Sequence, residues 1–472
     1  MSRVFSCDVC VIGGGPSGAV IATKLARLEH EVIVVSGPTT QRRPRVQSLS
    51  SGVLPILETL GMRHIFEAAG FLRPEAVTVQ WGMTQHVNPT NLQPQGFLVD
   101  RDRLDTIFLE EATKAGAHLV LGIVAPPGQK SDSWRLNVIM ADGPATIEAG
   151  FIVDATGRAG WLRKNSETKR IMVRHSPATL ALHAVWSMKA QTPPQMYVEA
   201  STDCWYWAAP IDRYSVSVTV FLDPVGHGLG IKALYYARID QSQLLRTLLS
   251  GGAPEPVHAY SASCYYDSNV AGSDWIKVGE ASLCVDPLAS QGVQLALSSA
   301  IHGAVVIHTL RMRPENTLAA LEFYHDRQCE AYLRHTVTAV RLYDEQFNVC
   351  QNDFWRKRAS TFGLSRPVAV PPDLRDWSAR TRVRLSDDTQ LTETPCLTGD
   401  FIEPQMALRH PNLERPLAFI DGISIALLLS HIGPDISVPG LVRQWQTLVP
   451  VDRGLKIARW LVEHQILVPC IH

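Results

Sequence analysis

The sequence predicts an α/β fold in three parts: a Rossmann-type nucleotide-binding domain, an antiparallel sheet and a small helical C-terminal domain. The first part is indicated by an apolar stretch, Val4 to Ile12, that leads into the glycine-rich segment 13–18 and then a helix-like segment. The second is indicated by residues 181–220, whose apolar and polar residues alternate as in antiparallel strands. The third follows the three prolines between Pro367 and Pro372, where short helical patterns begin.

Composition describes an ordinary folded protein and excludes several functions. Of 472 residues, 46% are apolar and 19% are charged, and the formal net charge is −1, so the basic excess of a nucleic-acid binder is absent. Nine cysteines, an odd number, do not form a disulfide framework, which favours a reducing, cytoplasmic location. Even the apolar stretch Ile423 to Leu429, which Ser424 interrupts, is far shorter than the ~20 residues of a membrane span. We expect neither nucleic acid nor membrane as a partner.

The glycine-rich segment predicts a pyrophosphate site. Gly13 permits a tight turn, Gly15 lets backbone amides approach phosphate without an intervening Cβ, and Gly18 lets the helix pack closely on the strand. Pro16 and Ser17, which are also candidate cofactor contacts, precede a helical pattern over Ala19 to Leu28, and the free N–H groups and positive dipole end at the start of this helix favour an anion.

The end of the second strand departs from the usual nucleotide-binding pattern. A ribose-binding acid is expected after the strand Glu31 to Val35, but Ser36 stands there and would bind a ribose hydroxyl more weakly than a carboxylate. The basic cluster Arg42-Arg43-Pro44-Arg45 follows. It is either a solvated loop or a contact with the cofactor, in which case Arg45 is the candidate.

The remaining elements follow in order along the chain. Val77 to Trp81 and Gly96 to Val99 read as strands of a second sheet, and Asp100-Arg101 opens a helix to Lys114. A strand from Ala145 to Ile152 leads into a sharp turn at Asp154-Ala155-Thr156-Gly157. A third group of motifs precedes a helix over 294–310, and consists of Gly279-Glu280-Ala281, Asp286-Pro287 and Gln291-Gly292.

The three blocks, in this order and spacing, make residues 5–360 resemble the FAD-dependent aromatic hydroxylases, a fold that includes the flavin-dependent tryptophan halogenases. The resemblance implies FAD, with Asp154 and Gly157 in the second block of its binding site. It also implies that Asp286 holds the ribityl chain and that Gly292 and Val293 offer N–H groups to the isoalloxazine ring. Asp286 could instead simply cap a helical turn.

The resemblance further implies that Arg101 contacts the cofactor, although a surface position at a helix start is the alternative. Gln291 is a candidate for lining the flavin or substrate site, and no metal is implied. In such enzymes reduced flavin and molecular oxygen form a C4a-hydroperoxide that hydroxylates an electron-rich aromatic ring. Electrons would come from NAD(P)H directly or through a flavin reductase.

Two features separate hydroxylation from halogenation. The stretch Trp205-Tyr206-Trp207-Ala208-Ala209-Pro210 resembles the W-x-W-x-I-P box of the halogenases, with Ala209 replacing isoleucine, and its two tryptophans point to one face of a strand. They line an indole pocket or form a core pair. Where halogenases carry a reactive lysine, an ungapped reading back from Trp81 places Arg73, whose guanidinium stays protonated and is a poor nucleophile. The pattern favours a hydroxylase.

The domain organisation points to a large partner. We expect a monooxygenase core over 1–375, with its substrate sheet built by about 70–100 and 170–270, and a separate small helical domain over 376–472, for which a winged-helix-like fold is one alternative. That tail holds 9 basic and 11 acidic residues. It therefore suits protein docking better than DNA, although it could also cover an edge of the core or mediate dimerisation.

The missing lysine, the tryptophan box and the extra domain resemble the branch that hydroxylates a tryptophan inside a partner polypeptide, during biogenesis of the tryptophylquinone cofactor of quinohaemoprotein amine dehydrogenase. Three other functions stay open. One is hydroxylation of a small free aromatic or indole, the second is halogenation, and the third is a non-enzymatic scaffold like the Rab escort proteins.

Overall fold

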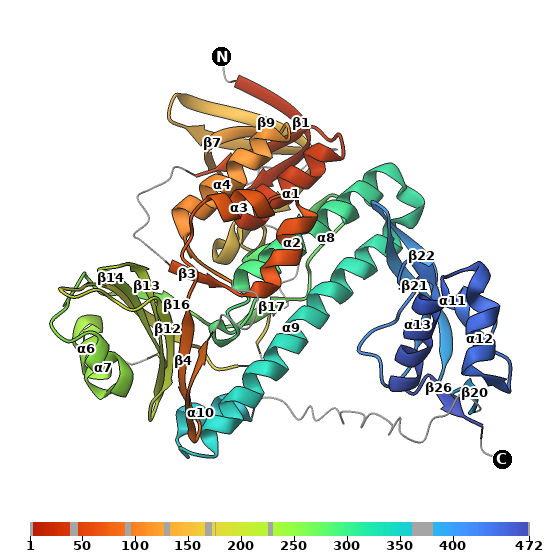
Figure 1. The fold of residues 1–472 in the computed structure, drawn as a ribbon. Coiled ribbons are helices and arrows are strands. Elements are labelled where there is room, and N and C mark those ends of the chain that lie inside the picture. Colours follow the sequence, from red (N-terminus) through yellow and green to blue (C-terminus); the bar gives the residue numbers. More distant parts are fainter. Residues whose placement is uncertain are drawn as a thin grey trace. The chain divides into compact units, whose positions relative to one another are not determined.

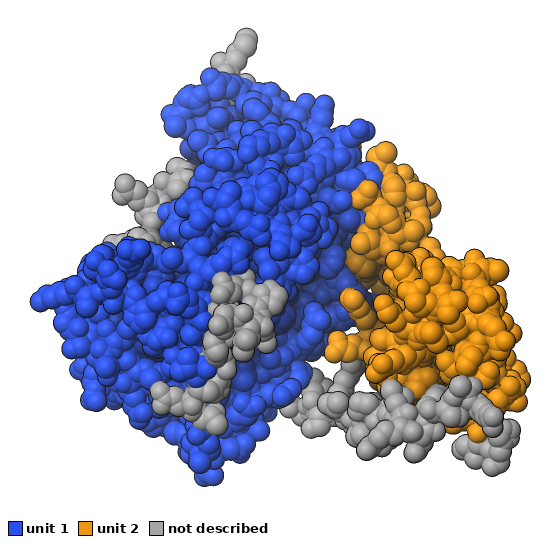
Figure 2. All heavy atoms as spheres, in the orientation of Figure 1, with its two compact units in different colours: residues 1–308, 324–363 blue, residues 309–323, 364–472 orange. Residues whose placement is uncertain are grey.

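The chain forms two compact units. The computed structural model describes residues 3–37, 46–89, 96–126, 133–165, 172–174, 176–224, 230–360 and 381–470. One unit comprises Met1–His308 and Tyr324–Gly363, and the other comprises Thr309–Phe323 and Leu364–His472. Figure 2 shows the two units in different colours. The second unit thus takes in the junction at 309–323 as well as the C-terminal residues.

A six-stranded sheet forms the centre of the first unit. Strands β2, β1, β9 and β18 run parallel, while β8 pairs antiparallel with β7 and β9. The register places Ile12 opposite both Val35 and Asp154, so the carboxyl ends of three parallel strands meet at one edge. The strands are β1 (Arg3–Ile12), β2 (Val32–Ser36), β7 (His118–Val124), β8 (Trp134–Met140), β9 (Gly143–Asp154) and β18 (Trp275–Lys277).

Helices cover this sheet and start at its carboxyl edge. α1 begins directly after the glycine loop, with proline in its first turn, and α4 is capped by Asp100, whose carboxylate accepts the Arg103 N–H at 2.9 Å. Figure 1 shows α1 and α4 (red to orange) side by side. The helices of this unit's first half are α1 (Pro16–Arg27), α2 (Leu54–Thr59), α3 (Arg63–Ala68), α4 (Arg101–Lys114) and α5 (Trp161–Asn165).

The substrate-side sheet has eight strands in the described residues, and they pair antiparallel as predicted except for β4 and β12, which run parallel. One of its faces packs on α6 and α7 through residues such as Tyr206 and Val218, and the other carries an aromatic cluster that includes Trp81 and Trp205. Its elements are β4 (Ala76–Trp81), β5 (Thr84–Pro89), β11 (Leu180–Ser187), β12 (Gln195–Ala200), β13 (Cys204–Asp212), β14 (Ser215–Leu222), β15 (Ala253–Pro254), β16 (His258–Ser261), α6 (Ile231–Gln241) and α7 (Gln243–Leu248).

One strand predicted for that sheet belongs elsewhere. β6 (Phe97–Asp100) pairs antiparallel with β3 (Val46–Leu49) and not with β4. The prediction was wrong because alternation identifies a strand but does not choose its partner. A further small sheet joins β10 (Met172–Val173), β17 (Tyr265–Asp267) and β19 (Leu283–Cys284).

The last helices of the first unit are α10 (Asp353–Ala359) and most of α8 (Gly292–Met312) and α9 (Thr317–Phe347), whose residues within 309–323 belong to the second unit. By length and composition α8 is apolar enough to cross a membrane, but 56% of its most apolar window is buried within the fold. This helix is therefore part of the protein core.

The second unit contains helices, as predicted, but it is a mixed α/β unit, because it also contains the strands β20 to β26. Its core surrounds Trp445 and Leu461. Asp421 and Gly422 adopt positive φ and turn the chain between two short strands, Phe419–Ile420 and Ile423–Ser424, before a helix starts. The elements are β20 (Arg382–Leu385), β21 (Gln390–Thr398), β22 (Phe401–Arg409), β23 (Phe419–Ile420), β24 (Ile423–Ser424), α11 (Ile425–Leu429), β25 (Ile436–Ser437), α12 (Val438–Gln444), α13 (Val451–Glu463) and β26 (Leu467–Pro469).

Candidate functional site

The glycine loop after β1 is shaped by close backbone contacts. Gly13 has φ of +112°, and a Cβ there would lie 2.5 Å from the Ala155 carbonyl oxygen. A Cβ on Gly18 would lie 1.8 Å from the Gly13 carbonyl oxygen. These two glycines therefore keep β1, α1 and the end of β9 together.

Gly15 has a different environment, with open space in front of it. The nearest atom to a Cβ built there is Nη2 of Arg101, at 3.5 Å. Arg101 opens α4, and Asp105 Oδ1 and Gln47 Oε1 accept its Nε–H and Nη1–H at 2.7 and 3.2 Å. The fold thus brings a guanidinium to the amino end of α1, where an anion is doubly favoured.

The ribose end of the site is less acidic than in most nucleotide folds. Ser36 ends β2 and lies beside the loop, because a Cβ on Gly14 would come 2.6 Å from its hydroxyl oxygen. Arg45, the predicted basic contact, lies outside the described residues.

The second block, Asp154 to Gly157, forms the turn at the end of β9. Asp154 is fully buried, and its two carboxylate oxygens accept the backbone N–H groups of Thr156 and Leu162 at 3.0 and 2.8 Å. Burial raises the pKa of this carboxyl, and the hydrogen bonds it accepts oppose that shift. Gly157 follows with φ of +61°, so Asp154 shapes the loop and Gly157 supplies its sharp bend.

The third block faces the second across the carboxyl edge of the sheet. Gly279 has φ of +61°, and a Cβ there would lie 2.6 Å from the Ser17 hydroxyl, so the first and third blocks also touch. The Glu280 side chain is 43% exposed, and its Oε1 is 3.4 Å from Nε of Arg158. A Cβ on Gly157 would lie 3.9 Å from Glu280 Oε2. This accessible carboxylate was quoted in the sequence motif but received no role in the sequence analysis.

Asp286 lies deeper than the ribityl role implies. Its Oδ1 accepts the Leu288 N–H at 3.0 Å and its Oδ2 accepts the Tyr343 hydroxyl at 2.9 Å. Burial raises the pKa of Asp286. Asp286 thus caps the helical turn at Leu288, which is the alternative role that the sequence analysis gave it.

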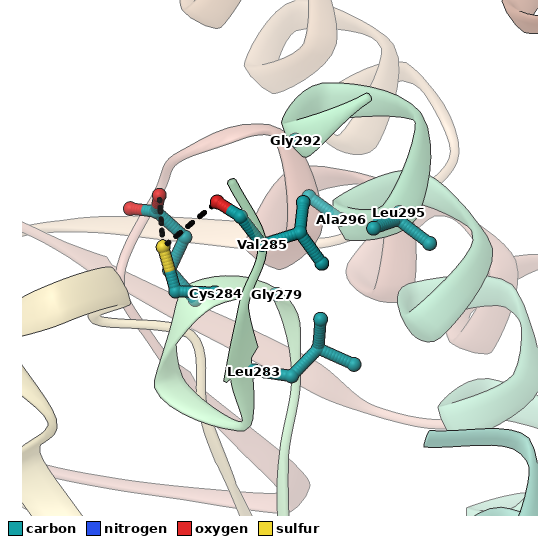
Figure 3. Close-up of a pocket in the computed structure, with 8 residues that line it drawn as sticks. Gly279, Leu283, Cys284, Val285, Gly292, Leu295 and Ala296 are labelled. Carbon is teal, nitrogen blue, oxygen red and sulfur yellow. Dashed lines mark hydrogen bonds between the residues drawn. The ribbon is translucent and has the colours of Figure 1, made fainter. Parts of the chain in front are cut away.

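A hollow connects the third block with the start of α8. Figure 3 shows Gly279, Cys284 and Val285 on one side and residues of α8 on the other. Gly292 begins the helix, a Cβ there would meet nothing within 4 Å, and Val293 is buried behind it. Gln291 precedes the helix next to Ser290, which has φ of +49°. The full lining consists of Gly279, Glu280, Leu283, Cys284, Val285, Gly292, Leu295 and Ala296.

The remaining predicted residues belong to the substrate-side sheet. Trp205 is buried and stacks on Phe221 with ring centroids 3.9 Å apart, which fits a core role. Trp207 is only partly buried and also contacts the cluster around Leu98. Arg73 lies over the Phe97 ring, with its guanidinium carbon 4.4 Å from the ring centroid. The pair Trp205 and Trp207 therefore contacts other aromatic residues than Arg73 does.

These parts fit a dinucleotide cofactor. The open space at Gly15, the Arg101 guanidinium and the free start of α8 suit a phosphate-containing ligand with a ring at its far end. No group of three or more histidine, cysteine or acidic side chains that could hold a metal ion occurs within the described ranges.

Comparison with known proteins agrees with this geometry. The FAD binding domain family matches residues 6–219. Tryptophan 2-halogenase of Chondromyces crocatus is 27% identical over 358 residues, which are 72% of this chain and 68% of that protein. The 1H-pyrrole-2-carbonyl-[peptidyl-carrier protein] chlorinase of Pseudomonas fluorescens is 24% identical over 62% of this chain and 74% of its own length. The protein is a flavin-dependent enzyme, an oxidoreductase of the monooxygenase class, and its sequence is similar to those of flavin-dependent halogenases.

Solved structures extend the likeness over the whole chain. The peptidyl tryptophan dihydroxylase QhpG, essential for tryptophylquinone cofactor biogenesis, has a TM-score of 0.76 and 26% identity, covering 97% of this chain and 99% of its own. The flavin-dependent halogenase CmlS has a TM-score of 0.79 at 20% identity, covering 99% of this chain and 96% of its own, and shows the shared fold.

Proposed function

We propose that this protein is an FAD-dependent monooxygenase that hydroxylates a tryptophan side chain of a partner polypeptide during quinone cofactor biogenesis. The observation that carries the proposal is the match to QhpG, which is described as a peptidyl tryptophan dihydroxylase and aligns over nearly the full length of both chains. The carrier-protein chlorinase offers a second, weaker indication, since its name gives a substrate that is also attached to a protein.

Different residues of the site would bind different parts of the cofactor. The amino end of α1 and Arg101 would bind the pyrophosphate, Glu280 the ribityl hydroxyls, and the N–H groups of Gly292 and Val293 the pyrimidine edge of the ring. Bound FAD, once reduced by NAD(P)H or a flavin reductase, supplies the activation of molecular oxygen. The buried apolar residues around the ring would exclude water from the reaction.

We assign the ribityl contact to Glu280 and not to Asp286. Both Asp286 oxygens already accept protein donors, whereas Glu280 is 43% exposed and borders the hollow in Figure 3. A carboxylate that stays accessible can accept hydroxyl donors of a ligand without losing a bond inside the protein.

Hydroxylation is favoured over halogenation by Arg73. Its guanidinium cannot give up a proton to become a nucleophile, and it is stacked on Phe97. Because the sequence relatives include halogenases, halogenation is the competing activity. The experiment below contains bromide so that a halogenated product would be detected.

The second unit is the proposed docking module for the polypeptide. An aromatic hydroxylase needs neither β20 to β26 nor α11 to α13 to hold FAD, and remote binding energy can position one indole of a large substrate. We also place the protein in the cytoplasm, a proposal that its nine free cysteines support.

The test is intact-mass analysis of a candidate partner polypeptide after incubation with the protein, FAD, a reductant, oxygen and bromide. One or two added oxygen atoms on a tryptophan support the proposal. An unchanged polypeptide together with a hydroxylated free indole would replace it with the small-molecule alternative, and a brominated product would replace it with halogenation.

A further inference from the structure

A buried tyrosine meets a buried carboxylate where α9 passes the turn before α8. The Tyr343 hydroxyl donates to Asp286 Oδ2 at 2.9 Å, and the two residues are 2% and 8% exposed. Val285, the neighbour of Asp286 in the chain, lines the hollow in Figure 3. The pair therefore lies directly behind the wall of the proposed flavin site.

The indole rings of two tryptophans, Trp355 and Trp81, pack next to the Tyr343 ring. The Trp355 and Trp81 ring centroids lie 6.0 and 6.4 Å from that of Tyr343, and 5.4 Å from each other. Trp81 is 7% exposed and ends β4, two residues before Met83, which is 87% exposed. The three rings thus form a contiguous cluster that extends from the residue paired with Asp286 to the end of β4, close in the chain to the exposed Met83.

The polar hydrogens of the three rings have different acceptors, and that of Tyr343 is the Asp286 carboxylate. The Trp81 indole N–H donates to the Leu342 carbonyl at 2.7 Å, and the Trp355 N–H donates to the Thr202 carbonyl at 2.8 Å. A backbone carbonyl does not take up a proton, whereas the Asp286 carboxylate can. Burial raises the pKa of both Asp286 and Tyr343, so the carboxylate is a better base and the phenol keeps its proton.

A phenol becomes a strong acid when it loses an electron, so its oxidation is easy only where the proton has a place to go. A phenylalanine would fill the same space in the aromatic cluster, and it is the hydroxyl that connects Tyr343 to Asp286. The arrangement therefore provides a site for coupled loss of one electron and one proton.

We propose that Tyr343, Trp355 and Trp81 form a relay that carries one-electron oxidising equivalents from the flavin site to the surface, with Asp286 as the proton acceptor. The relay rests on FAD binding in the proposed site and goes beyond the hydroxylation itself. It would protect the enzyme when reduced flavin meets oxygen before a slowly docking polypeptide has arrived.

The step balances as follows. Tyr343 gives one electron to photoexcited oxidised flavin, or to an oxygen-centred radical formed at the flavin, and its O–H bond breaks with the proton moving to Asp286. An electron from Trp355, which Trp81 replaces in turn, and the proton from Asp286 restore the phenol. A thiol in solution then gives an electron to the oxidised Trp81 and its proton to water, and two of the resulting thiyl radicals combine to a disulfide.

The test uses the FAD-loaded protein, frozen without oxygen under blue light, and records the electron paramagnetic resonance spectrum. We expect a protein radical whose hyperfine pattern changes when the tyrosines carry deuterium at Cβ. Tyr343→Phe should abolish this label-sensitive component. The matched control is Tyr324→Phe, because Tyr324 is a fully buried tyrosine of the same helix whose hydroxyl donates to the Lys277 carbonyl, and it should keep the signal.

The proposal is overturned if the labelled wild-type protein gives no label-sensitive radical, or if Tyr343→Phe and Tyr324→Phe give the same signal. Should Tyr343→Phe lose FAD, Trp81→Phe decides instead. Because Trp81→Phe removes the indole that would pass electrons to the tyrosyl radical, it should lengthen the lifetime of the tyrosyl signal. An unchanged lifetime would contradict the relay. Illumination needs no polypeptide, so failure of the relay and failure of peptide hydroxylation are observed separately.

Discussion

Arg101 lies against the glycine loop, with its Nη2 3.5 Å from the point that a β-carbon on Gly15 would occupy. Gly15 has φ of −75° and caps α1, so no backbone strain explains the glycine. The guanidinium is held in place by Asp105 and Gln47. The glycine therefore keeps space open beside a cation, as a phosphate site requires.

Gly15 and Gly18 should respond differently to the same change. In Gly15→Val the larger side chain fills ligand space, so FAD content should fall to near zero while the free energy of unfolding of the apoprotein changes by under about 1 kcal/mol. In Gly18→Val the side chain collides with the Gly13 carbonyl, which lies 1.8 Å from the Cβ position, and should destabilise the fold by about 1–3 kcal/mol or more. Flavin absorbance and urea unfolding measure the two effects. Normal FAD content in Gly15→Val would refute the placement.

Substitutions of Glu280 and Asp286, the two acids of the third block, should have different effects. Glu280→Gln should weaken FAD binding about tenfold, about 1.4 kcal/mol, with little change in apoprotein stability, because it changes a carboxylate assigned to the ligand. Asp286→Asn should instead lower stability by about 1–3 kcal/mol, because the turn at Leu288 and the Tyr343 hydroxyl lose a charged acceptor. Flavin fluorescence titration and thermal unfolding distinguish them. The reverse pattern would return the ribityl role to Asp286.

Halide should not alter the reaction product. With bromide present, the product of the wild-type protein should have the same mass as without it, because the Arg73 guanidinium stays protonated over Phe97. Arg73→Lys is the informative companion, since it offers an amine at this position. Detection of a brominated product from the wild-type protein would overturn the hydroxylase assignment.

The parts of the fold that follow from local rules could be predicted from the sequence. The steric demands of Gly13 and Gly18 act between the loop and its neighbouring strands, so the glycine spacing alone indicates the β1–α1–β2 unit. Arg101 was placed near the cofactor by resemblance, and the fold does bring it to the loop at Gly15.

The parts that depend on distant contacts could not be predicted. Asp286 is engaged by Tyr343, a residue 57 positions later in the chain, so nothing near Asp286 shows that its carboxylate is buried and occupied. Glu280 was overlooked for the same reason, because its exposure depends on how β19 and α8 pack around it. The pairing of β6 with β3 and the turn at Asp421 likewise depend on partners that alternation and periodicity do not specify.

His335 provides a pH-dependent measure of how well α9 is packed. It lies on the buried face of that helix and is 9% exposed. Burial, together with the nearby charge of Arg334, lowers the pKa of His335 to about 4 from the ordinary 6.5. The imidazole is therefore neutral in the folded protein over the range where the unfolded chain protonates it.

Replacing His335 should flatten the acid side of the stability curve. A folded pKa below the unfolded value means that the stability is complete above about pH 6.5 and is lost as pH falls toward 4, because the unfolded state then binds a proton that the folded state does not. The free energy of unfolding in urea, measured between pH 7.5 and 4.5, should fall less steeply in His335→Gln than in the wild-type protein. His64→Gln, at an exposed position of α3, should follow the wild-type curve. Equal slopes for His335→Gln and the wild-type protein would mean that packing around α9 does not hold this imidazole neutral.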